Sequence, residues 1–146
     1  MDKIDEFRGE YYFLSNFWSV PVTFGGITYQ NAEAAFQAQK VTDKKVQQAF
    51  SVLNPYEAKR RGRRVALRPD WEEVKVGLMQ EIVDAKFDQN PDLAEQLLKT
   101  KDAYLEEGNC WNDRIWGTVG GEGLNLLGKI LMKTRDRLKK QKNTEK

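Results

Sequence analysis

A carboxylate, an amide and an amine recur at helical spacing in one stretch of the chain. Glu33, Gln37 and Lys40 stand at i, i+4 and i+7, so a helix over residues 32–40 places all three on one side. The helix dipole favours a carboxylate in the first turn, whereas burial disfavours its ionisation and raises its pKa. The three side chains therefore form either a solvent-facing surface or a cleft lined by a carboxylate and an amine.

A second group of candidates lies in the segment 107–123, where the helical periodicity fails. Five glycines and two asparagines predict a long loop there, and Trp111 and Trp116 flank Asn112 and Asp113. Aromatic faces bind planar bases by stacking, which contributes about 1–3 kcal/mol per base. A neighbouring Asp or Asn can read a base edge, bind ribose hydroxyls or position water. The alternative is that both tryptophans anchor a core and Asp113 caps a turn.

Composition excludes several other chemistries. The 146 residues contain no histidine, which excludes Ser-His-Asp triads, Cys-His dyads and the common His-containing zinc sites. General acid–base chemistry near neutral pH must then use Asp, Glu, Lys, Tyr or Cys110. Residues 123–130 match the G-x-x-x-x-G-K pattern of a phosphate-binding loop, but they lack the Ser/Thr that ligates magnesium and follow no evident strand, so this assignment is rejected. We expect neither a metal nor a cofactor.

The net charge of +2 conceals two basic blocks. Residues 59–68 carry six basic and no acidic side chains, and residues 129–146 carry eight basic and two acidic side chains. Such blocks attract phosphates or nucleic acid, although they also suit solvated helix faces and helix C-termini. For the first block, the alternative to a dipole effect is an arginine clamp on a substrate phosphate. Residues 139–146 are expected to form a disordered basic tail.

The remaining pattern predicts a mostly helical α+β fold with a small β portion near the N-terminus. Residues 11–14 are a candidate strand, and residues 22–29 are typical of a hairpin with Gly25-Gly26 at its turn. An apolar stripe over residues 46–53 indicates a helix. The longest helix is expected to start at Asp70-Trp71 and to end at Asn90-Pro91. A short helix is expected around residues 93–98, and a last helix over residues 127–138. The expected N-cap residues are Asn31, Asp43, Asn54 and Asp70.

No linker or internal repeat divides the chain, so residues 1–138 are expected to form a single compact domain. No apolar run approaches the roughly 20 residues of a membrane span, and the first residues do not form a signal peptide. A single cysteine, Cys110, fits a reducing compartment. We therefore expect a cytoplasmic protein without a membrane partner; the oligomeric state is left open.

Several short motifs, taken in order, resemble the NADAR (YbiA-like) family. The first are Phe13-Leu14-Ser15-Asn16-Phe17 and the group formed by Tyr29, Glu33, Gln37, Gln39 and Lys40. The next are Arg60-Arg61-Gly62-Arg63, Asp70-Trp71 and Ala85-Lys86-Phe87. The last are Asn112-Asp113, Trp116-Gly117 and residues 123–132. The resemblance covers about residues 7–138. It departs from the family pattern at the N-terminus, at Trp111 and at residues 118–120, which bears on substrate choice more than on reaction class.

This resemblance implies a compact, mainly helical domain that hydrolyses N-glycosidic bonds. Family substrates include phosphorylated ribosylamino-pyrimidine intermediates of riboflavin biosynthesis, and some relatives remove ADP-ribose from guanine bases. The implied catalytic residues are Glu33, Lys40 and Asp113, with Trp71 as a platform for the base. Together with the charge pattern, the resemblance predicts the substrate-binding residues Arg8, Ser15, Asn16, Phe17, Arg60, Arg63, Trp71, Asn112, Trp116, Gly117 and Asn125.

The chemistry of N-glycoside hydrolysis fits these residue types. Cleavage of a ribosyl C–N bond develops positive charge on the sugar, which a carboxylate such as Glu33 stabilises, or that carboxylate activates water. Asp113 would orient hydroxyls, water or the leaving group. Lys40 either tunes Glu33 or acts as a nucleophile that forms an imine with the opened ribose.

The expected partner is a small phosphorylated ribosyl or ADP-ribosyl substrate, or an ADP-ribosylated nucleic acid. Two other functions fit the same residues. One is a non-catalytic module that binds ADP-ribose or NAD through the tryptophans and arginines. The other is a nucleic-acid protein that uses the two basic blocks, whose binding would fall steeply with salt.

Overall fold

The computed structural model describes residues 2–144 and divides the chain into two compact units. One unit is Asn16–Gln89, and the other joins the residues up to Ser15 with those from Asn90 onward. Helices predominate, accompanied by two small two-stranded sheets. The predicted mostly helical α+β class is therefore confirmed. Within residues 2–144, no helix has the length and apolar character needed to cross a membrane.

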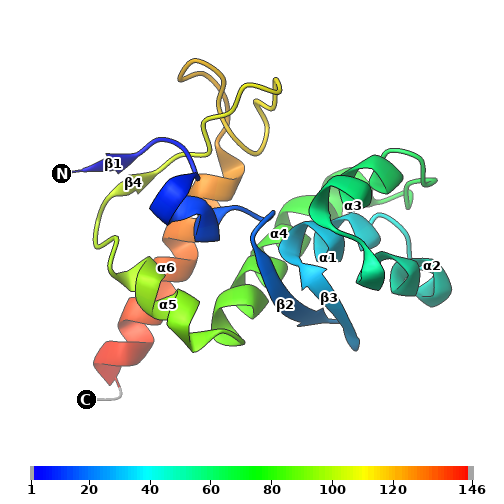
Figure 1. Cartoon of the computed structure of the whole chain (residues 1–146), viewed down its shortest axis with the longest axis horizontal. Coiled ribbons are helices and arrows are strands. Elements are labelled where there is room, and N and C mark those ends of the chain that lie inside the picture. Colours follow the sequence, from blue (N-terminus) through cyan, green and yellow to red (C-terminus); the bar gives the residue numbers. More distant parts are fainter. Residues whose placement is uncertain (1, 145–146) are drawn as a thin grey trace. The chain divides into compact units, whose positions relative to one another are not determined.

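The unit Asn16–Gln89 begins with the predicted hairpin (Figure 1). Strands β2 (Ser19–Phe24) and β3 (Ile27–Asn31) pair antiparallel. At the turn, Gly25 and Gly26 have φ values of +59° and +82°, a region that side chains rarely adopt. The elements that follow are α1 (Ala32–Ala38), α2 (Lys44–Ala49), the 3-10 helix η2 (Phe50–Val52), α3 (Pro55–Gly62) and α4 (Trp71–Asp88).

Helix α1 forms the centre of this unit. All seven of its residues are buried, because the hairpin, α3 and α4 pack around it. Four of them are alanines, which allow the neighbouring backbones to approach closely. The same packing encloses the two polar side chains of α1, Glu33 and Gln37. Buried polar groups are costly unless they are hydrogen-bonded, so the surroundings of this pair matter for both stability and chemistry.

Three of the four predicted N-caps are confirmed. Asn31, Asp43 and Asn54 each accept a hydrogen bond from a backbone N–H of the helix that follows. Asp70 instead pairs with Arg68, with 2.6 Å between Arg68 Nε and Asp70 Oδ1, and makes no capping bond. A charged guanidinium is a stronger donor than a neutral backbone N–H, which explains why the carboxylate turns away from the helix.

The predicted apolar stripe over residues 46–53 is partly wrong. Helix α2 ends at Ala49, and Val46 on it is 37% exposed. Gln47 is buried in its place, and its Nε2 donates to Val41 O at 2.8 Å. The helix is too short for the stripe to continue, and the following 3-10 helix brings Phe50 into the core.

The other unit joins segments that are distant in sequence. Strand β1 (Lys3–Ile4) lies parallel to β4 (Tyr104–Leu105), and α5 (Pro91–Leu98) packs on α6 (Leu126–Thr144) (Figure 1). The predicted strand over residues 11–14 is wrong, because these residues belong to the 3-10 helix η1 (Gly9–Leu14). A 3-10 helix buries the consecutive Phe13 and Leu14 without needing a partner strand.

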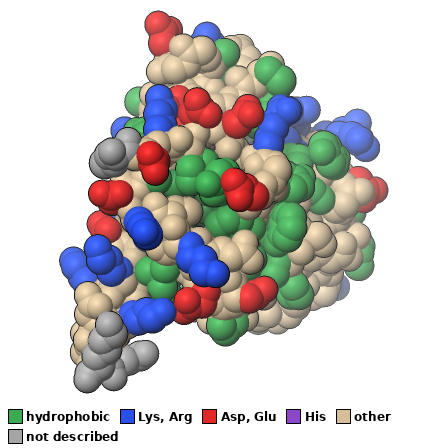
Figure 2. Space-filling view, turned by 60° about the vertical axis from the view of Figure 1, so that its left-hand side comes forward, with side chains coloured by type: hydrophobic (Ala, Val, Ile, Leu, Met, Phe, Trp, Pro, Cys, Tyr) green, Lys and Arg blue, Asp and Glu red, His purple; other side chains and the backbone are tan. Residues whose placement is uncertain are grey.

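Helix α6 continues through residues 139–144 of the segment that was predicted to be a disordered tail, and residues 145–146 lie outside the described residues. Lysine and glutamine are good helix formers, and Lys142 pairs with Glu95 of α5 at 3.0 Å between Nζ and Oε1. Near this end of the chain, Figure 2 shows Lys and Arg side chains interspersed with Asp and Glu. The surface there has mixed charge.

Lys86 on α4 is a fully buried amine. Its side chain is 1% exposed, and its Nζ lies 5.3 Å from the centre of the Phe87 ring. Burial disfavours the charged form and lowers the pKa of Lys86 from 10.5 to about 7. In the unfolded chain the amine is solvated and has its ordinary pKa. Unfolding therefore takes up a proton between about pH 7 and pH 10.

We expect the free energy of unfolding to rise with pH across this window. Below about pH 7 the folded protein holds a buried charge, which destabilises it. As the amine loses its proton with rising pH, this destabilisation falls, and the free energy of unfolding rises by at most about 1.4 kcal/mol per pH unit. Urea unfolding of the wild type and of Lys86→Met at about pH 6.5, 8 and 9.5 measures this effect. The methionine variant should lack the Lys86 part of the slope; a variant with the unchanged wild-type slope would contradict the assignment.

Candidate functional site

Glu33 is a buried carboxylate in the first turn of α1. The residue is 9% exposed, and its Oε2 accepts a hydrogen bond from Gln37 Nε2 at 2.6 Å. Its backbone N–H donates to Asn16 O at 3.0 Å, which ties the start of α1 to the segment before the hairpin. The predicted placement of Glu33 and Gln37 on one side of a helix is confirmed, and that side faces the interior.

Lys40 lies just beyond α1 and interacts electrostatically with Glu33. Its side chain is half-buried, and its Nζ donates to Gly62 O at 3.3 Å. Burial lowers the pKa of Lys40 below 10.5, the Arg63 guanidinium lowers it further, and the Glu33 carboxylate opposes both. A lowered pKa increases the fraction of neutral amine, which is the nucleophilic form of lysine.

Gly62 on α3 packs directly against the Gln37 side chain. A Cβ on Gly62 would lie 1.9 Å from Gln37 Oε1, so only glycine permits this approach. Gln37 Oε1 is buried and has no hydrogen-bond partner among residues 2–144. A buried amide oxygen without a donor is costly, so the close packing of Gly62 on Gln37 is made at the expense of a hydrogen bond.

Asn16 and Phe17 stand at the start of the same unit. Asn16 is 6% exposed, and its Nδ2 donates to Met79 Sδ at 3.3 Å, so its amide contacts α4. The Phe17 ring meets Tyr56 edge-on at 4.9 Å between ring centres, and Lys59 Nζ lies 5.8 Å from the Phe17 centre. A half-exposed ring beside a cation suits a planar or anionic group.

Trp71 is enclosed more fully than a base platform requires. It is 6% exposed, and its ring packs on Phe36 with 5.2 Å between the ring centres and an interplanar angle of 49°. This contact joins α4 to α1. The geometry therefore gives Trp71 a packing role, and stacking of a base on its ring stays a prediction.

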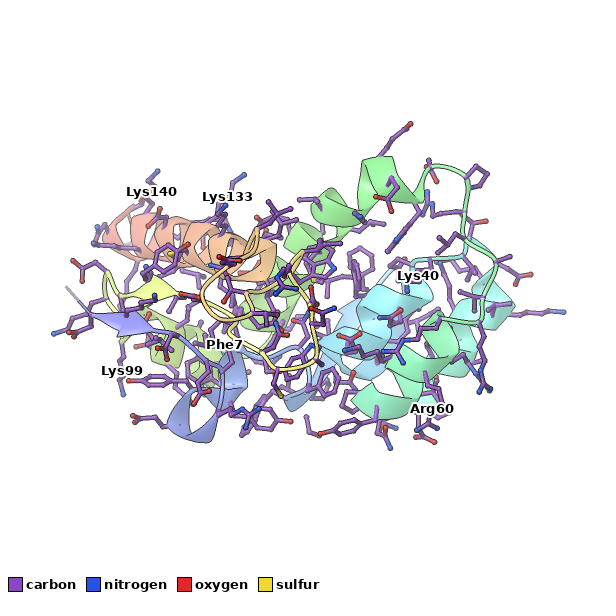
Figure 3. The ribbon with its side chains drawn as sticks, turned by 90° about the horizontal axis from the view of Figure 1, so that it is seen from above. Phe7, Lys40, Arg60, Lys99, Lys133 and Lys140 are labelled. Atoms are coloured by element: carbon purple, nitrogen blue, oxygen red, sulfur yellow. The ribbon has the colours of Figure 1, made fainter. Side chains whose placement is uncertain are left out.

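The two predicted phosphate-binding arginines of the first basic block have different neighbours. Arg63 directly follows α3 and acts on Lys40, whereas Arg60 lines a hollow between α2 and α3. Figure 3 shows Lys40 at the end of α1 and Arg60 on α3. Within the unit Asn16–Gln89, the structure thus brings together Glu33, Lys40 and Arg63.

In the other unit, the predicted loop is held by its own polar side chains. Asn109 Nδ2 donates to Asp113 O at 2.9 Å. Asp113 Oδ1 accepts from the backbone N–H groups of Ile115 and Trp116 at 3.0 and 2.9 Å, so Asp113 caps a turn. Its second oxygen, Oδ2, accepts no hydrogen bond within the described part of the chain.

Asn125 has a structural role in the same loop. It is 2% exposed, its Oδ1 accepts from Glu107 N at 3.0 Å, and its Nδ2 donates to Leu105 O at 2.9 Å. Gly117 is buried against Glu107 O, which would lie 2.1 Å from a Cβ at that position. A substrate contact at Asn125 would compete with these bonds and stays a prediction.

The other predicted residues of this unit differ in accessibility. Arg8 and Asn112 are exposed, and Ser15 and Trp116 are half-buried. Asn112 takes a φ of +69°, a conformation that asparagine tolerates better than most residues. Residues 2–144 contain no group of three or more His, Cys, Asp or Glu side chains able to hold a metal ion.

Two residues that shape these sites were absent from the predicted set. Gly62 had a recognisable signal, because an isolated glycine inside a helical pattern often marks close packing. Asn109 had only the loop composition around it, which does not specify which asparagine turns inward. Both act by contacts that are set by the fold.

Asp113 can be tested as a charge and as a turn residue separately. We expect Asp113→Asn to keep the Oδ1 acceptor and a melting temperature within about 2 °C of wild type, while turnover falls at least about tenfold if the carboxylate acts on the substrate. Asp113→Ala should also lose roughly 1 kcal/mol of stability, because two backbone donors lose their acceptor. Turnover kinetics and thermal melts measure both effects. Full activity in Asp113→Asn would leave Asp113 a turn residue only.

Comparison with known proteins relates this arrangement to one family. The NADAR domain matches residues 5–139. N-glycosidase YbiA of Escherichia coli (strain K12) is 40% identical over 129 residues, covering 86% of this chain and 80% of that protein. N-glycosidase Npun_R5314 of Nostoc punctiforme is 35% identical over 133 residues, covering 86% and 85%. Riboflavin biosynthesis protein VVA0006 of Vibrio vulnificus is 37% identical over 137 residues, covering 86% of this chain but 35% of that protein.

A solved structure agrees with these relatives. The NMR structure of E. coli YbiA superposes with a TM-score of 0.84 at 37% sequence identity, covering 96% of this chain and 85% of the other. The expected enzyme class, a hydrolase acting on N-glycosyl bonds, is confirmed by relatives named N-glycosidases that match most of the chain. The chain belongs to the NADAR domain family.

Proposed function

We propose that the protein hydrolyses the C–N bond between a phosphorylated or ADP-linked ribose and a base-like leaving group, at the Glu33 site. The observation that carries this proposal is the buried Glu33 carboxylate, held by Gln37 at 2.6 Å and accompanied by the half-buried amine of Lys40. A carboxylate in a low-dielectric site attracts a developing positive charge more strongly than one in water.

The reaction adds one water across the bond. The water oxygen bonds to C1′ of the ribose, and the departing nitrogen keeps the electron pair of the broken bond and gains a proton. Glu33 either accepts the proton from the attacking water or stabilises the ribosyl cation through its charge. Gln37 fixes the orientation of the carboxylate, because its amide donates to the Oε2 atom.

Lys40 has two possible roles at this site. In the first, its cation balances the Glu33 charge. In the second, its neutral amine attacks C1′, the base leaves, and ring opening gives an imine that water hydrolyses to regenerate the amine and release the sugar. The lowered pKa of Lys40 supports the second role, because only the neutral amine has the required electron pair.

Two substrates are proposed, and the surroundings of Glu33 suit what they share. Arg63 supplies a cation for a phosphate, and the Phe17 ring with Lys59 offers a face for a planar group. The name of the Vibrio vulnificus relative supports the ribosylamino-pyrimidine phosphates of riboflavin biosynthesis. ADP-ribosylated guanine is the second candidate. It contains the same kind of ribosyl C–N bond, and its ribose carries the larger ADP group.

The proposal is tested by incubating the protein, with a chelator present, with each candidate substrate. Mass spectrometry follows free base together with ribose phosphate or free ADP-ribose. Release of free base from one substrate with saturation kinetics supports the proposed reaction. It also identifies which of the two substrates the protein uses. Tight ADP-ribose binding without release from either substrate would overturn the proposal in favour of the binding module.

A further inference from the structure

A hollow of about 610 Å³ lies between α2 and α3, within the unit Asn16–Gln89. We call it the α2–α3 hollow. Its lining combines charged and aliphatic side chains, which we call the rim and the floor. The rim residues are Lys45, Glu57, Arg60, Arg61 and Arg64, and the floor residues are Val46, Ala49, Leu53 and Val65.

The three arginines of this rim are exposed and available to a ligand. Arg60, Arg61 and Arg64 make no side-chain hydrogen bond or ion pair within residues 2–144. The one acidic side chain of the rim, Glu57, is used in the capping box of α3 with Asn54. Three guanidinium groups with free donors therefore converge on one concave surface.

The helix dipole favours Arg60 and Arg61 in the last turn of α3, but Arg64 lies beyond that turn. Cations near a helix C-terminus are stabilised when they meet its last carbonyls. At α3 the Gly62 carbonyl accepts instead from Lys40 Nζ, at 3.3 Å, and none of the three guanidinium groups donates to a carbonyl among the described residues. The three guanidinium groups line one hollow, so they repel one another, and a bound anion would relieve that repulsion.

The periodicity of α3 separates this hollow from the Glu33 site. Glu57 and Arg61 are four residues apart on one side of α3, Arg60 is next to Arg61, and Arg64 follows in the turn after the helix. Ala58 and Gly62 form the buried side, where Gly62 meets Gln37. The hollow is therefore a second cationic surface on the helix that also borders Gln37.

We propose that the α2–α3 hollow is a second binding site, which takes a phosphate monoester carried on an apolar group. Guanidinium groups bind phosphate oxygens in pairs, and the aliphatic floor covers an apolar substituent. The absence of an aromatic side chain from the lining named above disfavours a stack of nucleic-acid bases. This site does not depend on the reaction proposed for Glu33.

Phenyl phosphate and inorganic phosphate are suitable probes. We expect phenyl phosphate to shift the backbone amide NMR signals of Val46, Ala49 and Val65 saturably, and to bind at least about threefold tighter than inorganic phosphate because of the apolar floor. Arg61→Gln/Arg64→Gln should weaken this binding about tenfold. This double variant should also melt at a slightly higher temperature than wild type, because the repulsion between like charges is relieved.

The matched control is Lys133→Gln/Lys140→Gln, which removes the same charge from α6. Both lysines project from one side of that helix in Figure 3, and neither lies near the floor residues in sequence. The control should retain wild-type phenyl phosphate binding within about twofold. If both double variants weakened phenyl phosphate binding equally, or if the amide shifts did not saturate, the binding would reflect only the overall positive charge of the protein. Either result would overturn the proposal.

Two further outcomes also decide the matter. A single-stranded dT12 oligonucleotide that shifts the same amides and binds at least about tenfold tighter than phenyl phosphate would make the hollow a nucleic-acid surface and overturn the proposal. Shifts at Glu33 and Gln37 with none at the hollow would place the probe in the Glu33 site and overturn it as well. Because these readouts measure binding, absence of turnover by the enzyme would leave the result unaffected.

Discussion

Glu33→Gln is expected to lower turnover of the N-glycoside substrate by about 10³-fold while the protein stays folded. The amide is nearly isosteric and its carbonyl oxygen still accepts from Gln37 Nε2, so packing around α1 is retained. What is lost is the negative charge that stabilises the ribosyl cation or activates water. The measurement is kcat and KM by base release, with a thermal melt for each variant.

The contrast between kcat and KM identifies the role. A fall in kcat with a nearly unchanged KM indicates an interaction made in the transition state. Glu81→Gln is the matched control, because it removes the same charge from an exposed position on α4. Wild-type turnover in Glu33→Gln would remove Glu33 from the mechanism.

Lys40→Arg is expected to lower turnover at least about 10²-fold, although it keeps the positive charge. Arginine has no accessible neutral form, so it cannot act as the nucleophile that the lowered pKa of Lys40 supports. Borohydride treatment during turnover should reduce the imine of the wild type and leave the sugar on Lys40, seen as an added mass in a peptide containing that residue. Lys40→Arg should give no such adduct.

The control for this substitution is Lys99→Arg, at an exposed position in the other unit. If Lys40→Arg retained activity within about tenfold and no adduct formed, Lys40 would act through its charge on Glu33 alone. The two proposed roles of Lys40 therefore give different results in both kinetics and mass spectrometry.

The local features of the fold were largely predictable from the sequence. The features predicted correctly involve residues only a few positions apart, so they can be recognised in the sequence. They are the N-caps at Asn31, Asp43 and Asn54 and the turn at Gly25-Gly26. Errors arose where a competing local arrangement was favoured. Asp70 prefers the Arg68 guanidinium to a cap, and residues 11–14 bury their side chains in a 3-10 helix.

The candidate site was predictable to a lesser extent. The i, i+4 relation of Glu33 and Gln37 follows from helical geometry. The absence of histidine limited the acid–base residues, and the reaction class was implied by the resemblance to the NADAR family. The burial of Trp71 against Phe36 and the use of the Asn125 amide within its loop were not predictable. The same types of side chain serve to bind a base and to fill a core. Only the neighbours in the folded protein distinguish the binding role from the packing role.

The sequence by itself thus determined most of the local elements, the residue types available for acid–base chemistry, and the side of α1 that carries Glu33. Tertiary structure alone decided that this side is interior, because the hairpin, α3 and α4 close around α1. It also decided that Lys40 is desolvated and that Gly62 meets Gln37. The physical reason is that helical periodicity is a property of neighbouring residues, whereas desolvation depends on elements that the chain brings together from a distance.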